Sequence, residues 1–375
     1  MDLGLYLHLP FCISKCPYCD FNSYPLTEGK ELEHYLNALY GEIEIYSEKM
    51  KNRNIESIYF GGGTPTVLSG LSIYNIINYC KKTFKMNKEI EITIEANPGT
   101  LSKRKLKLIY QSGVNRLSIG GQSFDDLLLK KLGRIHTVRE IIESYYMARE
   151  AGFKNINIDI MYALPEQSLK NLKTTLKKAV KLKPEHVSIY GLTINPGTKY
   201  YYDYQNNLLK LPSEDEEYDM FKWIINFLKQ NNYEQYEISN FALPSKRSVH
   251  NQIYWKNQEY LGIGAGAYSY LKGYRYGNIK KPVRYISKIS EGKLPIDEGE
   301  RLSLKKRMAE TIILGLRTKE GIGFKRFRER FKIDIDNVFG TQIDKLINLK
   351  LIKREKNKIK LSKDGIFVAN VVFRE

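Results

Sequence analysis

The sequence is short of cysteine and of long apolar runs, and each shortage excludes a class of protein. It has only 4 cysteines, three of them within eight residues, and such crowding is not a disulfide framework. No run of about 18 apolar residues occurs, so no segment is predicted to span a membrane. The first residues, MDLGLYLHLPFC, lack the basic start and small-residue cleavage site of a signal peptide. We therefore expect a cytoplasmic protein whose clustered cysteines bind a metal or a metal cluster.

Acidic residues are also few: 42 Asp and Glu stand against 60 Lys and Arg, which gives a formal net charge of +18. A basic balance can serve nucleic acid, an anionic membrane surface or an anionic ligand. Because the lysines are spread along the whole chain and no basic stripe carries interleaved aromatic residues, we expect no nucleic-acid partner. The 375 residues, 42% of them hydrophobic, are enough for one large domain and one or two smaller ones.

Short segments rich in β-branched residues alternate with longer segments whose apolar residues recur at three- and four-residue steps. Strands that each lead into a crossover helix form a parallel sheet, which right-handed crossovers curl into a full or partial barrel. The predicted fold class is therefore α/β, with a partial parallel (β/α)6 barrel. The predicted strands are 4–9, 56–60, 90–95, 114–119, 154–160 and 186–192, and the helices between them are 30–50, 71–84, 101–112, 137–151 and 168–182.

The pattern changes after the sixth strand. A helix is predicted at 213–231, opened by Ser213 as its N-cap, and a seventh strand at 233–239. The next sixty residues are rich in Gly, Pro and Tyr and show weak periodicity. Three helical segments follow, and 351–370 is typical of a two-strand wing. We predict a barrel at 1–240, a connecting region at 241–300 and a small winged-helix-like α+β domain at 301–375.

Polar or glycine residues directly follow the predicted strands, where parallel barrels carry their chemistry. We expect these residues to face one pocket. Glycines at 61–63 would let the backbone approach a ligand and offer free N–H groups, or else form a tight strand-to-helix turn. In strand order the residues are Cys12, the GGGT run at 61–64, Glu95 with Asn97, Gln122 and Asp159.

The cysteines stand in the segment HLPFCISKCPYCDF with the spacing C-x3-C-x2-C, at Cys12, Cys16 and Cys19. Three thiolates can hold three irons of a [4Fe–4S] cubane and leave the fourth iron open. An open iron can chelate the amino and carboxylate groups of S-adenosylmethionine (SAM), whose sulfonium the cluster can cleave to a 5′-deoxyadenosyl radical. The alternative is zinc, which takes four ligands, usually from paired C-x2-C units or a His pair. Cys80, on a predicted amphipathic helix, is expected in the core, and His8 is expected to be structural.

Longer blocks surround these motifs and cover nearly all of residues 1–270. They are LHLPFCISKCPYCDFNSY, IYFGGGTPTVL, EITIEANPGT, VNRLSIGGQSFDD, LKKLGRIH, INIDIMYALPEQ, VSIYGLTINPGT, YEISNFALP, HNQIYW and YLGIGAGAYSY. On these blocks the chain resembles the radical SAM family of oxygen-independent coproporphyrinogen III oxidases and their relatives, the HemW-type haem chaperones. The resemblance implies a radical SAM barrel with a [4Fe–4S] cluster on the three cysteines.

The resemblance also implies a set of SAM contacts. SAM is a zwitterion that carries a ribose, so its binding site needs hydrogen-bond acceptors for the ammonium and hydroxyl groups and a cation for the carboxylate. For each polar contact the alternative is an ordinary strand-end residue. Tyr6 would lie near the cluster, and Tyr18 and Cys19 would touch SAM through the motif backbone. The amino and carboxylate end of SAM would meet Gly62, Gly63 and Thr64, and Glu95 would take the amino group or a ribose hydroxyl. The ribose and carboxylate side would be lined by Gln122, Arg134 and Asp159.

Three features bear on the choice between the oxidase and chaperone branches. The oxidases carry a further Cys where this chain has Phe21, and a long N-terminal extension where only eleven residues precede the first cysteine. The block HNQIYW resembles the HNxxYW motif of the chaperone branch. Its His250 is a candidate axial ligand for haem iron, or else a hydrogen-bonded structural residue, while Tyr254 and Trp255 offer aromatic packing. The family usually has His where this chain has Tyr268.

We therefore predict a haem chaperone that takes haem as cargo and passes it to haem proteins, membrane-associated ones included, with an electron donor if the cluster is redox-active. The positive charge favours the propionates of haem and approach to the anionic inner face of a membrane. The alternative is an oxygen-independent coproporphyrinogen III oxidase, which forms protoporphyrinogen IX by SAM-dependent oxidative decarboxylation. A third class is a radical SAM enzyme that modifies nucleic acid with its C-terminal domain.

Overall fold

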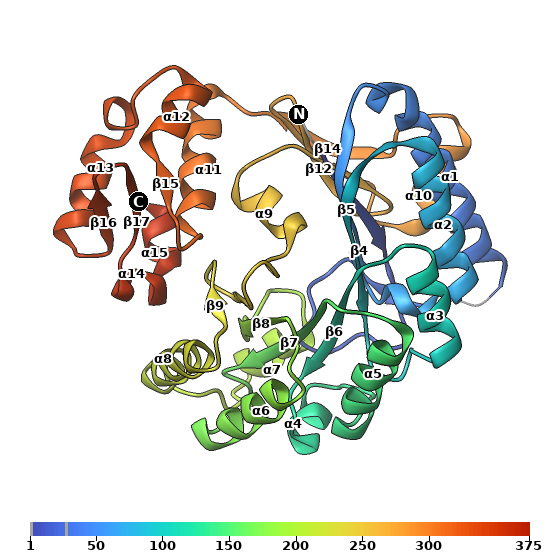
Figure 1. The fold of residues 1–375 in the computed structure, drawn as a ribbon, viewed down its shortest axis with the longest axis horizontal. Coiled ribbons are helices and arrows are strands. Elements are labelled where there is room, and N and C mark those ends of the chain that lie inside the picture. The colour runs from blue at the N-terminus through green and yellow to red at the C-terminus, as the bar shows by residue number, and fades with distance from the viewer. Residues whose placement is uncertain (1–2, 27–28) are drawn as a thin grey trace.

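A computed structural model describes residues 3–26 and 29–375 as an α/β protein built on one twelve-stranded sheet (Figure 1). The six predicted parallel strands are confirmed, and they lie in chain order in the middle of this sheet. Their side chains are mostly buried on both faces, as in parallel sheets covered on both sides. The strands are β1 (Leu3–Leu9), β4 (Asn54–Gly62), β5 (Lys85–Ala96), β6 (Arg116–Gln122), β7 (Ile156–Tyr162) and β8 (His186–Gly191).

Crossover helices cover one face of the parallel strands, as Figure 1 shows for α1, α2, α3, α5 and α6. Local capping explains where they begin. Thr137 and Ser168 each form a capping box, which satisfies the free N–H groups of the first turn. The predicted helices are confirmed as α1 (Lys30–Met50), α2 (Gly70–Thr83), α3 (Lys103–Gln111), α5 (Val138–Ala151) and α6 (Leu169–Lys181), with a short α4 (Asp126–Lys131) besides.

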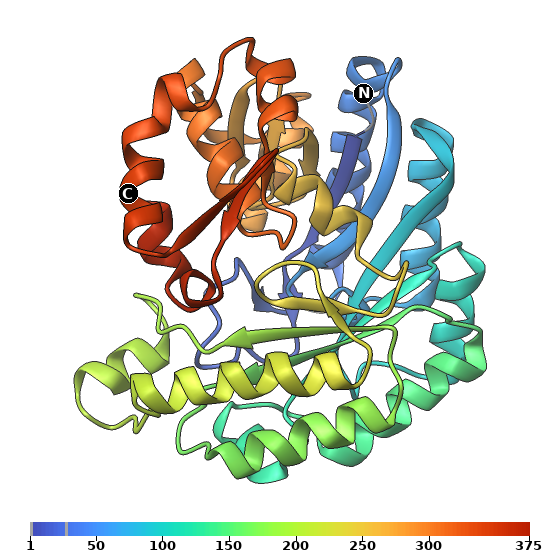
Figure 2. The same ribbon diagram turned by 60° about the vertical axis from the view of Figure 1, so that its left-hand side comes forward.

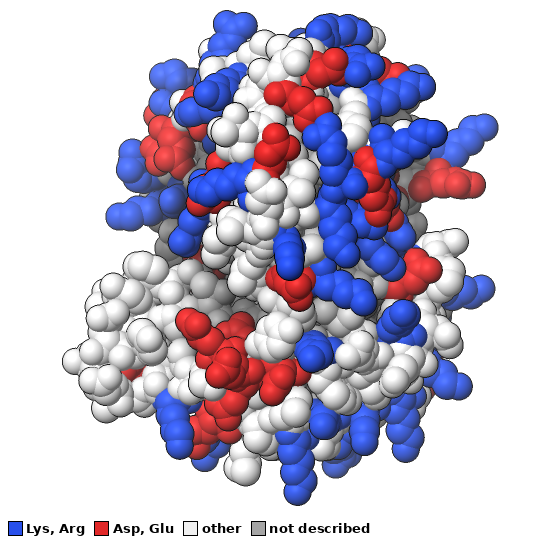
Figure 3. All heavy atoms as spheres, turned by 90° about the vertical axis from the view of Figure 1, so that its left-hand side faces the viewer, with Lys and Arg blue, Asp and Glu red and all other residues white. Residues whose placement is uncertain are grey.

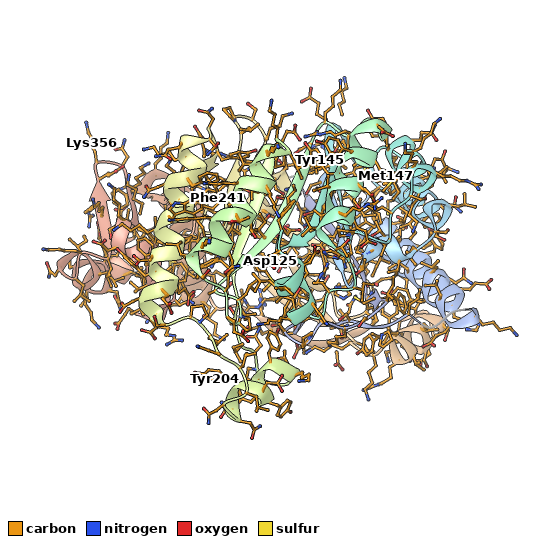
Figure 4. The ribbon with its side chains drawn as sticks, turned by 90° about the horizontal axis from the view of Figure 1, so that it is seen from below. Asp125, Tyr145, Met147, Tyr204, Phe241 and Lys356 are labelled. Carbon is orange, nitrogen blue, oxygen red and sulfur yellow. The ribbon has the colours of Figure 1, made fainter. Side chains whose placement is uncertain are left out.

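Two helices follow β8. The predicted helix at 213–231 is confirmed as α8 (Glu214–Gln230), with a capping box at Ser213. The shorter α7 (Lys199–Gln205) projects from the body of the molecule, and Figure 4 shows Tyr204 on this projection. Within the described ranges, no helix combines the length and the apolar character needed to cross a membrane.

The seventh strand predicted at 233–239 does not form as one strand. Instead β9 (Glu234–Gln235) and β10 (Asn240–Ala242) make a short antiparallel pair, and β10 runs antiparallel to β8. The chain turns between them because the buried carboxylate of Glu237 accepts hydrogen bonds from the Ser239 N–H at 3.1 Å and from Asn240 Nδ2. A buried acid therefore closes a turn where the sequence pattern indicated an extended segment.

Residues 241–300, predicted as a connecting region, add four strands to the opposite edge of the main sheet. The first runs parallel to β1 and the other three continue as an antiparallel meander. These strands have four to six residues, which is too few for a clear periodicity in the sequence. The elements are α9 (Val249–Trp255), β11 (Tyr260–Ile263), β12 (Tyr268–Leu271), β13 (Tyr274–Asn278), α10 (Pro282–Ser290) and β14 (Ile296–Arg301).

The last part of the chain has its own hydrophobic core and its own three-stranded sheet, β15-β17-β16 (Figure 2). The two wing strands are present, but the segment 351–370 does not end as a wing. Ser362 accepts a hydrogen bond from the Gly365 N–H at 2.9 Å and starts a helix instead. The domain boundaries at 240 and 300 stay a prediction. The elements are α11 (Leu304–Leu316), β15 (Ile322–Gly323), α12 (Phe324–Phe331), α13 (Asp336–Asn348), β16 (Ile352–Glu355), β17 (Lys358–Leu361), α14 (Lys363–Phe367) and α15 (Ala369–Arg374).

A buried carboxylate fastens the first helix to the added strands. Glu42 of α1 is fully buried and accepts hydrogen bonds from the Gly264 N–H at 2.8 Å, from Asn278 Nδ2 at 2.7 Å and from the Tyr285 hydroxyl at 2.6 Å. These donors lie after β11, at the end of β13 and on α10. Burial raises the pKa of Glu42 to about 7, although its three donors oppose the rise.

This raised pKa predicts a pH-dependent stability. A carboxyl with a raised folded-state pKa stabilises the fold below its ordinary pKa of 4.5, and that contribution is lost as the pH rises through about 7. Between pH 5 and 8, Glu42→Gln should therefore gain up to about 3 kcal/mol of unfolding free energy relative to wild type. Urea unfolding at several pH values measures the difference, with the exposed Glu44→Gln as control. A constant difference between wild type and Glu42→Gln would contradict the prediction.

Candidate functional site

A cavity of about 400 Å³, the first cavity, opens at the carboxyl ends of the parallel strands. It brings together the three clustered cysteines and every predicted SAM contact but one. The exception is Tyr6, whose ring stacks at 6.2 Å on Tyr59, and Tyr59 lines the cavity. The predicted residues on its wall are Cys12, Cys16, Tyr18, Cys19, Gly62, Gly63, Thr64, Glu95, Gln122, Arg134 and Asp159.

The cysteine loop leaves the end of β1 and is closed by a small parallel pairing, β2 (Phe11–Cys12) with β3 (Tyr24–Pro25). A hydrogen bond from the Cys19 N–H to the Cys16 carbonyl, 3.1 Å long, turns the chain inside the loop. From outside, the Tyr200 N–H of α7 donates to the Pro17 carbonyl at 2.9 Å. The loop is therefore shaped before any metal enters, which lowers the entropic cost of binding one.

Asn22 ties the other end of the cysteine loop to a distant part of the chain. Its Nδ2 donates to the carbonyl oxygens of Ala265 and Lys280, both at 3.0 Å. Ala265 lies in the turn between β11 and β12, and Lys280 lies between β13 and α10. The loop is therefore clamped against the strands that residues 241–300 add to the sheet.

The thiols of the loop are free and partly exposed. Cys12 Sγ lies 3.5 Å from Thr64 Oγ1, and Arg134 Nη1 donates to Cys16 Sγ at 3.6 Å. Burial raises the pKa of Cys12 and of Cys19, so a bound cation is needed to keep these thiols ionised at neutral pH. Among the described residues, no three His, Cys, Asp or Glu side chains are placed to hold a single metal ion. Three thiols in one cavity, with no fourth Cys of the described chain beside them, suit three irons of a cluster whose fourth iron stays open.

The glycine run packs directly against the cysteine loop. A Cβ on Gly63 would lie 2.5 Å from the Phe11 carbonyl oxygen, and one on Gly62 would lie 2.7 Å from the ring of His8. Gly62 also has φ 110°, which other residues rarely adopt. The Gly63 and Thr64 N–H groups donate to the carbonyls of Leu9 and Phe11, so these two are not free for a ligand. The glycines therefore leave room for the Phe11 backbone and the His8 ring, and their contact with SAM stays a prediction.

Two half-buried carboxylates face the first cavity. Glu95 accepts hydrogen bonds from the Tyr59 hydroxyl at 2.8 Å and from the Gly62 N–H, and burial raises its pKa to about 7. Burial also raises the pKa of Asp159, which accepts from Ser118 Oγ at 2.9 Å and from Asn157 Nδ2 at 2.8 Å. Both groups are therefore held in place as acceptors, and their charge is costly until a cation or a donor arrives.

Arg134 supplies the positive charge on the cysteine side of the cavity. Its Nη2 donates to Asn97 Oδ1 at 2.5 Å and to the Gly120 carbonyl at 3.0 Å, and Asn97 in turn donates to Thr64 Oγ1 at 2.7 Å. Its Nε is buried without a partner among the described residues. This unsatisfied donor fits an anionic ligand group, such as a carboxylate, beside the cysteines.

Sequence reasoning missed a polar floor beneath these residues. Arg116 is 1% exposed and lines the cavity, as do Asn157 and Ser188. A signal for them was present in three neighbouring strands, which carry polar residues two positions apart and therefore on one face. These pairs are Arg116 with Ser118, Asn157 with Asp159, and His186 with Ser188.

The candidate haem ligands lie outside the first cavity. His250 is 1% exposed, its Nδ1 lies 2.8 Å from Ser57 Oγ and its Nε2 lies 2.8 Å from the Tyr254 hydroxyl. Burial, with Arg116 nearby, lowers the pKa of His250 to about 3, so the ring is neutral. Because both nitrogens are engaged, iron coordination by His250 requires one of these bonds to break. Tyr254 lines a second cavity, and Tyr6 lines it too.

Helix α9, which carries His250, is fixed at both ends. At its start the carboxylate of Glu91 accepts hydrogen bonds from the N–H groups of Val249 and His250, both at 3.1 Å. At its end the Lys256 carbonyl accepts from Arg326 Nη2 at 2.9 Å, and Arg330 Nη2 donates to the next carbonyl at 2.6 Å. A negative charge at the N-terminus and positive charges at the C-terminus both suit the helix dipole.

The chain matches two protein-family models. Residues 6–179 match the radical SAM superfamily, and residues 302–368 match the HemN C-terminal domain. Among solved structures, a coproporphyrinogen III oxidase (HemN) from Escherichia coli, described as a radical SAM enzyme, superposes with a TM-score of 0.87. It is 24% identical, and the alignment covers 100% of this chain and 89% of that one. That likeness establishes the shared fold.

Curated relatives are closer in sequence. A protein of Lactococcus lactis named haem chaperone HemW is 40% identical over 371 residues, 99% of this chain and 96% of the relative. One of Bacillus subtilis with the same name is 37% identical over 369 residues, 98% of this chain and 97% of the relative. A zebrafish (Danio rerio) mitochondrial protein, radical S-adenosyl methionine domain-containing protein 1, is 29% identical over 91% of this chain and 78% of its own length.

The cysteine geometry gives a prediction about iron. Protein reconstituted anaerobically should hold about four irons per chain, and Cys12→Ala, Cys16→Ala and Cys19→Ala should each lose the cluster. Cys80→Ala is the matched control, because Cys80 is fully buried in the core. Iron and sulfide content with the visible absorption spectrum provide the measurement. Loss of the cluster in the Cys80 variant alone would overturn the ligand assignment.

The two carboxylates give a prediction about SAM. Removing a charge-assisted hydrogen bond costs about 1.5–3 kcal/mol, so Glu95→Gln and Asp159→Asn should weaken SAM binding roughly ten- to a hundredfold while iron is retained. Because the pKa of Glu95 is raised to about 7, its carboxylate forms as the pH rises from 6 to 8. SAM affinity should therefore increase over that range in wild type and stay flat in Glu95→Gln.

Equilibrium binding of SAM at pH 6, 7 and 8 is the measurement for both variants. Glu89→Gln, at an exposed position of the same strand, is the control. Wild-type affinity in both cavity variants would place the SAM pocket elsewhere.

Proposed function

We propose that this chain, which belongs to the HemW family of radical SAM proteins, is a haem chaperone that binds haem and passes it to haem proteins. The observation that carries the proposal is its likeness, along nearly the whole of both chains, to curated relatives of that name. A second observation agrees with it. Phe21, at the position where the oxidases carry a further Cys, is 65% exposed beside the cysteine loop and offers no fourth thiol.

In this proposal Cys12, Cys16 and Cys19 hold a [4Fe–4S] cluster and the first cavity holds SAM. When bound, the reduced cluster supplies the electron that can cleave the sulfonium of SAM. The protein's own part is to bind and orient. Arg134 is positioned for the SAM carboxylate, while Glu95 and Asp159 are acceptors for its ammonium and hydroxyl groups. The rest of the proposed SAM site is lined by the other predicted contacts, Tyr18, Gly62, Gly63, Thr64 and Gln122.

The oxidase alternative makes a different demand on the same fold. Oxidative decarboxylation of coproporphyrinogen III requires a propionate carbon held beside the SAM ribose in a site that excludes water. A chaperone requires an accessible haem site that can release its cargo. The likeness to the oxidase structure is one of fold, whereas the likeness to the HemW relatives runs through the sequence, which favours the chaperone.

We propose haem proteins as recipients, those bound to membranes included, and an electron donor for the cluster where it is reduced. Lys and Arg outnumber Asp and Glu about two to one over residues 302–375. Figure 3 shows many basic side chains over the upper part of this face, with some acidic ones among them, and a cluster of acidic side chains lower down. A basic surface of this kind is attracted to anionic headgroups, each Lys or Arg near the surface contributing about 1 kcal/mol.

An anaerobic assay with two readouts tests the function. Reconstituted protein should bind haem, give a Soret band and transfer haem to an apo haem protein, and it should form no protoporphyrinogen from coproporphyrinogen III, SAM and a reductant. Because the HNQIYW motif supplies our candidate ligands, His250→Ala and Tyr254→Phe should each shift or weaken the Soret band. Turnover of coproporphyrinogen III without haem binding at micromolar protein would favour the oxidase.

A further inference from the structure

The second cavity, about 520 Å³, shares the cysteine loop as a wall with the first cavity and has not yet been assigned a ligand. Its other walls come from β1, α9, β11 and β12. Its volume lies within the range of roughly 300–1,000 Å³ that is typical of small-molecule sites. The cavity is therefore large enough for a ligand of cofactor size.

Aromatic rings dominate this cavity, and three of their hydroxyl groups already have protein partners. The Tyr6 hydroxyl lies 3.0 Å from His8 Nδ1, the Tyr254 hydroxyl lies 2.8 Å from His250 Nε2, and the Tyr268 hydroxyl donates to Glu298. With these hydroxyls held by the protein, the rings offer mainly apolar surface, which suits a flat, largely apolar ligand. The aromatic residues that line the cavity are Tyr6, Phe21, Tyr24, Tyr254, Tyr260 and Tyr268.

Two lysines give the rim of the second cavity a positive charge. Lys280 is exposed, and its Nζ has no hydrogen-bonded or ionic partner within residues 3–26 and 29–375. Lys15 Nζ makes only long contacts, 3.4 and 3.5 Å, with two carbonyls of the cysteine loop. Neither lysine forms an ion pair with a nearby acid of the described residues: Asp20, which also lines the cavity, accepts a hydrogen bond from Asn195 at 2.7 Å, and Glu298 accepts one from Tyr268. The rim therefore has two cations available for anionic groups.

The first cavity offers the opposite chemistry. Its floor carries Arg116, Glu95 and Asp159, and the proposed function fills it with the cluster and SAM. A porphyrin ring has little polar surface to pair with these charged groups, so it would displace their water without giving them a new partner. An apolar macrocycle with carboxylate arms therefore matches the second cavity and not the first.

We propose that the second cavity is the haem site, with the macrocycle packed on the tyrosines and the two propionates paired with Lys15 and Lys280. The inference rests on the proposed function, because it names where the cargo binds. It also assigns parts to the HNQIYW motif: Tyr254 reaches the cavity, and His250 is a positioning residue that holds the Tyr254 hydroxyl from behind. Tyr268, where the family usually has His, packs against the macrocycle.

Haem and haem dimethyl ester, which lacks the carboxylates, are the probes that test the charge assignment. In reconstituted protein, Lys280→Gln should weaken haem binding roughly threefold to tenfold and leave ester binding unchanged, because a partly exposed ion pair contributes about 1 kcal/mol. Lys15→Gln should weaken haem binding and spare ester binding in the same way. Its iron content is measured as well, because Lys15 lies in the cysteine loop. Lys281→Gln, one residue along and outside the cavity lining, is the matched control and should bind both probes as wild type does.

A wall variant tests the ring contacts separately. Tyr268→Ala removes a ring from the cavity and should weaken haem and ester alike, by roughly tenfold, through lost packing area. Tyr274→Ala is the control, because Tyr274 is 48% exposed on the next strand and does not line the cavity. Both variants change exposed side chains, so the fold should be preserved, and circular dichroism verifies it.

The outcomes distinguish failure of the chaperone proposal from failure of the cavity assignment. Wild type that binds neither probe would overturn the chaperone proposal and this inference with it. Haem binding that is unchanged in Lys15→Gln, Lys280→Gln and Tyr268→Ala would overturn the cavity assignment and leave the chaperone proposal standing. Equal loss of haem and ester in Lys280→Gln would overturn the pairing with propionates.

Discussion

The strand β1 is hydrogen-bonded to a parallel neighbour on each side, and both cavities depend on that pairing. Leu9 stands opposite Gly62 of β4, and Leu7 stands opposite Ile263 of β11. Past the end of the strand the ladder continues, as the Gly63 N–H donates to the Leu9 carbonyl at 2.9 Å. A shift of one residue would exchange inward and outward side chains along the whole strand. The register therefore fixes where the cysteine loop begins and which wall each cavity receives.

Much of this arrangement follows from local sequence patterns. Six strands alternate with helices at a spacing that only a parallel sheet accommodates, and polar residues follow the strands directly, so the meeting of Cys12, Glu95 and Asp159 could be predicted. The edges of the sheet could not. The turn at Glu237 depends on burial of a single acid, and the helix after Ser362 depends on one cap in a segment of otherwise strand-like composition. Neither cause is visible in a periodicity.

Residue roles were harder to predict than residue positions. His250 stands in a recognisable motif, yet whether its nitrogens are available depends on Ser57 and Tyr254, one of which lies 193 residues earlier in the chain. Tyr6 alternates with buried leucines on β1, and only the strand order shows that Tyr59 stands between it and the first cavity. Arg116 is a charged residue in an otherwise apolar strand. That pattern predicts a site residue only when it is compared with the polar pairs of the neighbouring strands.

The clamp at Asn22 has a consequence for the order in which the molecule is made. Its two acceptors lie 243 and 258 residues further along the chain, so the cysteine loop emerges from the ribosome first and is enclosed among the last. At about 5–20 residues per second, the interval is on the order of 10–50 s. For that time the three thiols are attached to a nascent chain that lacks β11 and α10, open to oxidation and to the wrong metals. A cluster inserted before residue 280 is made would therefore sit on a loop that lacks this clamp, and oxygen present during synthesis would meet thiols that the finished fold holds in place.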